Sequence, residues 1–390
     1  MVGGASLYDS AQMDGGGGGG GAAIGRSQRR IIVESAAAGG AGAGAGVADT
    51  DGDSEESSEG AAHTSAVIFK ERWEEKEARL RAAAVAAGKL SPDSKAGWRL
   101  FPIIVKANDD LRQEQFVSQL IRQFDRIFRD AELDVWLRPY EILALGPRAG
   151  VLEAIPDTVS LHALKRNWMA ANGSAPGAGG ARGTDSATAG GGAAAAAGRS
   201  GILPDFMRRH FGNRGLRHAR ECFVESCAAY SIVCYLLQIK DRHNGNILLD
   251  SEGHLIHIDW GFVLGQSPGR NFGFEKAPFK LTAEFVAVMG GPRSFAFQRF
   301  RNLCVRAFLE ARRNREKIIT LVEVAIEGTP SLPCFTSNPN ACVDELRRRF
   351  QPGKSVREVI DFVNAMIDDS LDNWRTRWYD KWQRMMQGLL

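Results

Sequence analysis

Lys240-Asp241-Arg242-His243-Asn244-Gly245-Asn246, followed closely by Asp259-Trp260-Gly261, is the densest group of polar and glycine residues in this sequence. Two short apolar runs, Ile247–Leu249 and Leu255–Ile258, lie between these polar groups and are joined by Ser251-Glu252-Gly253. Short apolar runs separated by a glycine-containing turn are typical of a β-hairpin. The pattern therefore predicts a hairpin with one polar loop before its first strand and another after its second.

The polar residues around this hairpin are of the kinds that phosphoryl transfer requires. That reaction needs oxygen ligands that hold metal ions on a triphosphate, a group that takes or orients the hydroxyl proton, and a lysine that holds the phosphates. Asn246 and Asp259 would lie at the two ends of the hairpin, so their oxygens can converge on magnesium. Asp241 and His243 share a loop and can address a hydroxyl, while Lys106 ends a predicted strand far upstream. A lone Asp or His would more simply satisfy a polar turn, but the complete string favours catalysis.

Two low-complexity regions divide the chain. Residues 1–62 contain glycine runs and an acidic stretch, and residues 171–200 are almost entirely Gly, Ala and Ser. Such segments bury too little apolar surface to offset their conformational entropy, so we expect both to be disordered. We interpret the remaining blocks as a smaller N-terminal lobe with a hinge, residues 63–170, and a larger C-terminal lobe, residues 201–390.

The first block has the pattern of a small sheet with helices, and the second is mainly helical. The elements predicted in the first block are a charged helix within 63–89, a strand at Arg99–Lys106, a long helix after Asn108-Asp109-Asp110, and strands at Val135–Leu145 and Gly150–Ile155. The apolar stripe of the long helix is Phe116, Leu120, Phe124, Ile127 and Phe128. The helices predicted in the second block are Gly201–His210, Arg217–Ile239 and most of Leu281–Leu390. The fold class is therefore α+β.

Charge and cysteine content exclude several classes of protein. The formal net charge is +3 with 24% charged residues, so no chain-wide field points to nucleic acid. The six cysteines form no CxxC pair, and no secretory leader precedes them, which indicates reduced thiols in the cytosol. The most apolar segment, Cys227–Ile239, is too short to span a bilayer, and Val2 stands where myristoylation needs Gly. Any contact with a membrane is expected to be peripheral.

The loops around the hairpin resemble those of the phosphatidylinositol 3- and 4-kinase family. Asp241–Asn246 (DRHNGN) is similar to the catalytic loop of that family, and His257–Phe262 (HIDWGF) to its metal-binding loop. Other similar segments are Ile104–Glu114 (lysine strand and helix), Trp136–Tyr140 (adenine-pocket strand), Gly150–Glu153 (hinge), Asn271–Thr282 (end of the activation loop), Leu332–Phe335 and Leu346–Phe350. The run Phe285–Gly291 most resembles the type III beta phosphatidylinositol 4-kinases. The resemblance implies a bilobal protein-kinase-like fold, with a small antiparallel-sheet N-lobe and a larger, mainly helical C-lobe.

The resemblance also implies a role for each matching residue. The implied ATP-binding residues are Lys106, Glu114, Tyr140, Glu153, Ala154 and Ile155. Asp241 and His243 would handle the proton of the substrate hydroxyl. Asn246 and Asp259 would bind Mg²⁺, with Mn²⁺ as an alternative. The residues implied to face the lipid headgroup are Lys280, Lys276 and Arg270.

Two departures from the family pattern stand out. Trp260 takes the place of the usual Phe in the metal-binding loop, and this larger ring needs more room. Gly88–Ser94 occupies the place of the phosphate loop without its motif. These departures leave the pose of the activation loop and the phosphate contacts open.

The implied activity is transfer of the ATP γ-phosphate to the 4-hydroxyl of phosphatidylinositol. The alternatives are a phosphoinositide 3-kinase, a phosphatidylinositol-kinase-related protein kinase and an inactive scaffold. The activation loop carries Arg270, Lys276 and Lys280 opposed by Glu275, which is too sparse a cationic cluster for a multiply phosphorylated ring. The charge pattern therefore favours unmodified phosphatidylinositol as substrate.

The C-terminal segment has a tryptophan stripe at helical spacing, namely Trp374, Trp378 and Trp382, with basic residues between. Such a stripe suits a membrane interface, and it equally suits a helix packed over the catalytic loop. The resemblance further implies a monomer in the cytoplasm, bound peripherally to Golgi or endosomal membranes and recruited there by a small GTPase or an adaptor.

Overall fold

The computed structural model describes residues 69, 71–91, 98–172, 201–266, 277–336 and 338–371. The segment 1–62, residues 173–200 of the Gly/Ala insertion and the C-terminal tryptophans lie outside these residues. Among the described residues, α2 (Trp73–Ala86) forms within the range where the sequence predicts a charged helix. None of its side chains is buried, in keeping with its high content of charged residues.

The first sheet consists of three short antiparallel strands. They are β1 (Ile103–Ala107), β2 (Ile142–Gly146) and β3 (Ala149–Glu153), in the order β1-β3-β2. Lys106 pairs with Gly150 across this sheet. A Cβ on Gly150 would lie 2.5 Å from Leu111 Cδ1 and 2.9 Å from the Leu143 carbonyl oxygen. Only glycine therefore leaves room for the Leu111 side chain against this sheet.

One prediction about these strands is wrong. The strand predicted at Val135–Leu145 begins only at Ile142, because the preceding backbone bonds to helices: Trp136 N–H donates to Glu225 O, and Tyr140 O accepts from Ser118 Oγ. Pro139 also has no N–H to offer to a sheet. The strand predicted at Gly150–Ile155 is confirmed as β3, which ends at Glu153. The segment Gly150–Glu153, which resembles the hinge, lies within this strand, so the connection to the second sheet starts after it.

The long amphipathic helix predicted from its apolar stripe is α3 (Arg112–Asp130). The stripe residues Phe116, Leu120, Phe124, Ile127 and Phe128 are all buried, which confirms the periodicity. The helix begins two residues after the predicted Asn108-Asp109-Asp110 signal, with Leu111 at the N-cap position. Asp110 nevertheless accepts a hydrogen bond from Arg112 N–H and so satisfies one donor of the first turn.

The second sheet contains the predicted hairpin. Its strands β5 (Ile247–Asp250) and β6 (Leu255–His257) are antiparallel, and β4 (Thr158–Ser160) adds to the outer side of β5. The three-residue β4 was not predicted, since so short a run has no visible alternation. Gly253 turns the hairpin at φ +106°, where its missing side chain also makes room for Ala219 O.

Helices make up most of the described chain from Leu161 onward. They are α4 (Leu161–Ala171), α5 (Ile202–Leu237), α6 (Ala283–Val288), α7 (Phe295–Arg313), α8 (Arg315–Gly328), α9 (Pro339–Arg349) and α10 (Val356–Ser370), with short 3₁₀ turns η2 (Asn244–Asn246) and η3 (Pro333–Phe335). The backbone leaves helical geometry at Gly212 and splits α5 in two, close to the two helices predicted there. Its second half is almost wholly buried, as expected for a central helix.

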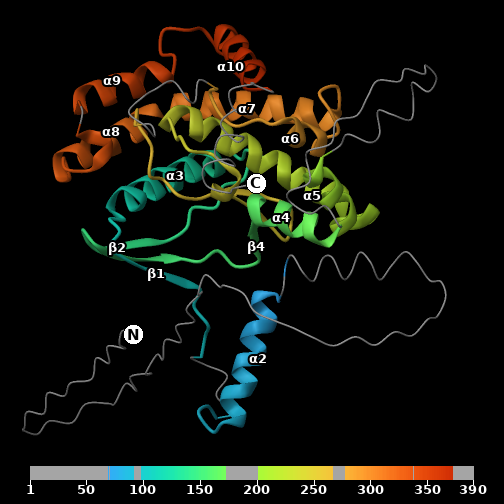
Figure 1. Ribbon diagram of the computed structural model, residues 1–390. Helices are drawn as coiled ribbons and strands as arrows, with labels where there is room; N and C mark the ends of the chain where they lie inside the picture. Colours follow the sequence, from blue (N-terminus) through green and yellow to red (C-terminus); the bar gives the residue numbers. More distant parts are fainter. Residues whose placement is uncertain are drawn as a thin grey trace, which may run out of the picture.

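Figure 1 shows how these elements are arranged. Helices α7 to α10 gather on the side opposite β1 and β2, and α3 and α5 run between the two sides. The α+β class, with small antiparallel sheets and a larger helical part, is confirmed. No helix among the described residues combines the length and apolar character needed to cross a membrane.

Candidate active site

Arg242 ties the two polar loops together at the open end of the hairpin. Its guanidinium donates to Ile258 O at 2.8 Å, to Asp259 O at 2.5 Å and to Lys240 O at 3.0 Å. Ile258 N–H also donates to Asn246 O at 3.1 Å. The sequence analysis gave Arg242 no role. Its burial, which only the structure shows, marks it as a paired residue, because arginine is rarely buried without partners. These bonds fix the positions of the residues on either side of the hairpin.

Asp241 and Asp259 both adopt left-handed backbone conformations, with φ of 63° and 65°. Such angles are strained for residues other than glycine, although Asp tolerates them better than most. Strain of this kind persists where the surrounding contacts hold it in place, and it is concentrated at functional sites. The loops before and after the hairpin are therefore held in conformations that the chain would not adopt alone.

His243 is held in one orientation and one tautomer. Its Nδ1 accepts the Gly245 N–H at 2.9 Å, so the proton of the neutral ring is on Nε2, which lies 3.9 Å from Asp241 Oδ2. Burial lowers the pKa of His243, and the charges of Arg242 and Lys280 lower it further against the opposing effect of Asp241 and Asp259. In this geometry His243 is a hydrogen-bond donor, and the Asp241 carboxylate is the acceptor beside it.

Asn246 and Asp259 each use one side-chain atom to stabilise the loop. Asn246 Nδ2 donates to Asp241 O at 3.1 Å, and Asp259 Oδ1 accepts Gly261 N–H at 3.2 Å. The amide oxygen of Asn246 and the second carboxylate oxygen of Asp259 are then the atoms that could bind a metal ion. Two such oxygens on neighbouring loops fit Mg²⁺, which takes few protein ligands and keeps water or phosphate oxygens for the rest.

Lys106 and Glu114 come from β1 and α3. Lys106 Nζ bonds to Asp109 Oδ2 at 3.0 Å; burial lowers the pKa of Lys106, but Asp109, Glu114 and Asp259 together raise it. Burial, followed by the charge of Asp259, raises the pKa of Glu114 to about 7. Asp109, given no role of its own in the sequence analysis, is the direct partner of the lysine, whereas Glu114 acts on it through charge.

Tyr140 and Trp260 form the buried wall behind Asp259. The Tyr140 hydroxyl accepts Asp259 N–H at 3.3 Å, and burial raises the pKa of this hydroxyl. The Trp260 ring stacks on Tyr140 with centroids 6.4 Å apart, and the Arg242 guanidinium lies 5.3 Å from the Trp260 ring centroid. The larger ring, only 1% exposed, is therefore accommodated, but its Nε1–H has no hydrogen-bond partner.

A family model described as phosphatidylinositol 3- and 4-kinase matches residues 100–334, which include all the loops described above. The chain belongs to this family. It is 44% identical over 324 residues to a phosphatidylinositol 4-kinase of Dictyostelium discoideum, with 82% of this chain and 24% of that protein covered. It is 41% identical to phosphatidylinositol 4-kinase beta 1 of Arabidopsis thaliana, covering 82% of this chain and 26% of the relative.

A third relative, phosphatidylinositol 4-kinase beta of Xenopus laevis, is 37% identical, with 84% of this chain and 36% of the relative covered. The chain thus spans 24% to 36% of the length of these curated relatives. Membership of the family confirms the resemblance and the bilobal protein-kinase-like fold expected from it.

Glu153, Ala154 and Ile155 belong to the implied ATP-binding set, and two of them use their backbone N–H groups inside the protein. Glu153 N–H donates to Glu141 O at 2.8 Å, and Ala154 N–H donates to Pro102 O at 2.9 Å. The Glu153 carboxylate pairs with Arg138. Among these three residues, Ile155 has the N–H that remains for adenine.

A pocket of about 1060 Å³ lies between α3 and the first sheet, lined in part by Phe101, Leu143, Tyr140 and Glu153. Although Tyr140 and Glu153 belong to the predicted ATP set, none of the predicted catalytic or metal-binding residues lines this pocket. The pocket therefore lies along the first sheet and α3, and Tyr140 in its lining connects it to Asp259 of the polar loop.

Lys280, assigned by the resemblance to the lipid headgroup, packs on the catalytic loop. It is 7% exposed, and its Nζ donates to Asn244 Oδ1 at 3.1 Å. The other two residues of the implied lipid site, Arg270 and Lys276, lie outside the described residues, as do Trp374, Trp378 and Trp382.

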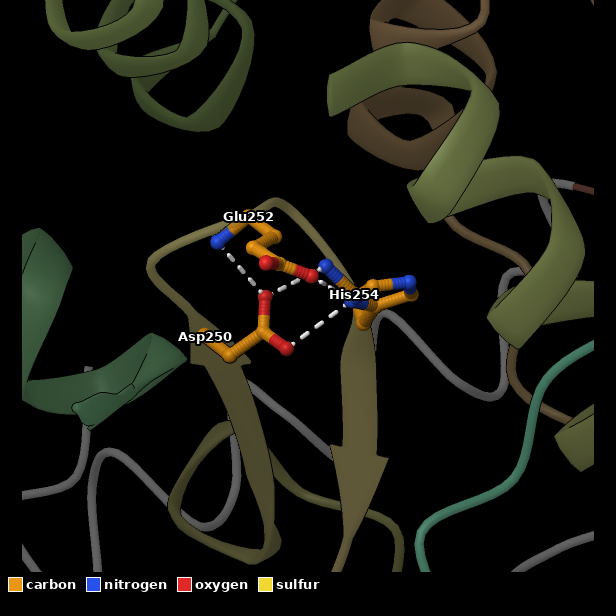
Figure 2. Close-up of side chains that lie close together, drawn as sticks. All are labelled: Asp250, Glu252 and His254. Carbon is orange, nitrogen blue, oxygen red and sulfur yellow. Dashed lines mark hydrogen bonds and ion pairs between the residues drawn. The ribbon is translucent and has the colours of Figure 1, made fainter. Parts of the chain in front are cut away.

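A second polar cluster, Asp250, Glu252 and His254, lies at the turn of the same hairpin (Figure 2). Asp250 Oδ1 accepts the N–H groups of Glu252, Gly253 and His254, while its Oδ2 lies 2.9 Å from His254 Nδ1. Burial lowers the pKa of His254, but the interactions of the ring with Asp250 and Cys222 together outweigh burial and raise the pKa to about 9. With this proton in place, His254 and Asp250 form an ion pair that closes the turn, and a metal ion would have to displace the proton to bind there.

Proposed function

We propose that this chain transfers the γ-phosphoryl group of ATP to the 4-hydroxyl of phosphatidylinositol, giving phosphatidylinositol 4-phosphate. The observation that carries the proposal is the pair of strained aspartates, Asp241 and Asp259, held on two loops that Arg242 joins. The names of the relatives support a phosphatidylinositol 4-kinase over the 3-kinase, protein-kinase and scaffold alternatives.

The proposed metal ligands are Asn246 and Asp259, which would hold Mg²⁺, or Mn²⁺ in its place. A divalent ion there neutralises charge on the triphosphate when it is bound. Lys106 would hold the phosphates, with Glu114 and Tyr140 behind them and Ile155 N–H on the adenine. The bond between Lys106 and Asp109 is half exposed, so the ammonium can exchange that partner for a phosphate oxygen.

Asp241 and His243 would divide the proton chemistry between them. Asp241 has the acceptor oxygens that can take the proton of the inositol hydroxyl. His243 presents Nε2–H, which can donate to a developing negative charge, because its other nitrogen is occupied by Gly245 N–H. Since Lys280 bonds to Asn244 in the same loop, the lipid ring would approach from that side. Lys276 and Arg270 would share this role, as the resemblance implies.

The proposal extends to the surroundings of the enzyme. We propose a monomer without nucleic acid partners that works in the cytoplasm on phosphatidylinositol in a membrane of the Golgi or endosomes. Recruitment by a small GTPase or an adaptor, and contact of Trp374, Trp378 and Trp382 with the bilayer, belong to the same proposal. The predicted division into residues 1–62, 63–170, 171–200 and 201–390 is retained as its domain scheme.

The test is turnover of the purified chain with ATP, Mg²⁺ and vesicles of phosphatidylinositol, followed by analysis of which ring hydroxyl carries the new phosphate. We expect a 4-phosphate and much slower turnover on vesicles of the bisphosphate. A 3-phosphate product would identify a phosphoinositide 3-kinase, and phosphorylation of peptides alone would identify a protein kinase. If the folded protein phosphorylates neither lipid nor peptide, the inactive scaffold is the alternative that remains.

A further inference from the structure

Gln113 makes three hydrogen bonds that join distant parts of the chain. It lies in the first turn of α3 and is 5% exposed. Its Nε2 donates to Trp260 O at 3.1 Å and to Gly261 O at 2.8 Å, and its Oε1 accepts Cys334 N–H at 2.9 Å. A glutamine amide has two N–H donors and one oxygen acceptor, so every polar atom of this side chain is used.

The two carbonyls that Gln113 holds belong to the residues directly after Asp259. Asp259 has a strained backbone with φ of 65°, and a strained residue keeps its conformation only if its neighbours are fixed. Arg242 holds the Asp259 carbonyl, and Tyr140 holds its N–H. Gln113 supplies the contacts on the C-terminal side, so the backbone of Asp259–Gly261 is bonded on both sides of Asp259.

The third bond of Gln113 extends this hold to η3. Cys334 is the middle residue of η3, and Phe335 beside it packs edge-on against Phe116 of α3 with ring centroids 5.6 Å apart. The start of α3, the Asp259–Gly261 turn and η3 are therefore fixed relative to one another through one amide. Loss of this amide would leave the buried Trp260 carbonyl and the buried Cys334 N–H without their partner, and the part-buried Gly261 carbonyl would lose its bond as well.

We propose that Gln113 is a positioning residue for metal binding, which holds the Asp259–Gly261 backbone so that the Asp259 carboxylate faces the metal ion. This inference rests on the proposed function, because it assumes that Asp259 is a metal ligand. Residues that orient a metal ligand without touching the metal affect affinity strongly. Gln113 would make no contact with the reacting atoms and would act only through Asp259.

The helix contains a matched control two residues further along. Gln115 also uses its side-chain oxygen to accept a backbone N–H, that of Ala144 in β2, at 3.0 Å. Gln113→Met and Gln115→Met therefore remove the same functional group from the same helix. Only the first removes a contact with the Asp259–Gly261 turn.

The first measurement is the Mg²⁺ concentration that gives half-maximal ATP binding to the full chain, without lipid. Gln113→Met should raise this concentration by about 10-fold, the lower end of the usual effect of losing a residue that orients a metal ligand. Gln115→Met should leave it unchanged. The second measurement is hydrogen exchange without metal or nucleotide, in which peptides covering 259–261 and 332–335 should exchange faster in Gln113→Met alone.

Unchanged Mg²⁺ dependence in Gln113→Met, whatever its melting temperature, would overturn the proposal. If that variant does not fold, Gln113→Glu carries the test, because it keeps the acceptor for Cys334 N–H but cannot donate two N–H bonds to the carbonyls. Wild-type Mg²⁺ dependence in Gln113→Glu would also overturn it. If the wild-type chain binds no ATP with Mg²⁺, the proposed function fails. Hydrogen exchange then tests Gln113 on its own: equal exchange in Gln113→Met and wild type would show that Gln113 does not fix the Asp259–Gly261 backbone.

Discussion

The two ends of the β5–β6 hairpin carry similar residues in different states. Asp241, His243, Asn246 and Asp259 lie at the open end, and Asp250, Glu252 and His254 lie at the turn. Each group offers carboxylates and an imidazole, and by residue type either could hold a metal ion. At the turn, Asp250 accepts three backbone N–H groups and pairs with His254.

The open end differs in how its polar atoms are used. Both of its aspartates are strained, and the oxygens that could bind a metal are not consumed by the bonds that hold the loops. His254 at the turn is stacked on Trp136 with centroids 4.0 Å apart and holds its proton, whereas burial favours neutral His243 at the open end. Residue types therefore do not distinguish a structural cluster from a catalytic one, but the partners of each polar atom do.

The largest expected effect is that of Asp259→Asn at the open end. The amide keeps an oxygen that accepts Gly261 N–H, so the fold should stay intact, while the charge needed by the metal is lost. We expect turnover to fall on the order of 10³-fold, which is several kcal/mol of transition-state stabilisation. The check is a vesicle assay with a melting curve, and Asp250→Asn is the matched control at the turn. Near-normal turnover in Asp259→Asn would show that the Asp259 carboxylate at the open end is no more important for catalysis than Asp250 at the turn.

A smaller effect is expected in the pH dependence of stability at the turn. The pKa of His254 is about 9 in the folded protein against 6.5 for an ordinary histidine, so the folded state keeps its proton to higher pH than the unfolded chain does. The free energy of unfolding is thus highest below about pH 6.5 and should fall by up to about 3 kcal/mol as pH rises to about 9.

Asp250→Asn should flatten this dependence, because it removes the charge that holds the proton while keeping an oxygen for the three backbone N–H groups. The measurement is urea unfolding of both proteins at several pH values between 6 and 9.5 (about the window set by the two pKa values). Parallel curves for wild type and variant would show that the ion pair is not what stabilises the turn.

The smallest effect is expected for Glu252→Gln, also at the turn. Glu252 is 65% exposed on its side chain and lies 3.8 Å from His254 Nδ1, so solvent screens the pair. We expect the free energy of unfolding to change by less than about 0.5 kcal/mol and turnover to stay unchanged. Thermal unfolding with and without 1 mM Zn²⁺ (roughly a saturating concentration for a three-ligand site) extends the test. If Zn²⁺ raises the melting temperature of the wild type but not that of Glu252→Gln, the turn binds the metal ion.

Elements whose information is local could be predicted from the sequence. The stripe of α3 and the two strands of the hairpin follow from side-chain periodicity over a few residues, and both are confirmed. The strand predicted over Val135–Leu145 was wrong, since its backbone bonds to Glu225 and Ser118 on distant helices. Strand β4 was missed because it exists only through pairing with β5.

The sequence by itself determined which polar residues gather at the open end of the hairpin, because the residues of the two polar loops flank one hairpin and come together as soon as it forms. It could not determine which polar atoms remain available within that group, nor that Gln113 would meet Gly261 and Cys334. Those residues are 148 and 221 positions away from Gln113, and only packing of α3 against η3 and the metal-binding loop brings them together. Contacts over such separations depend on how whole elements pack, which no local pattern in the sequence encodes.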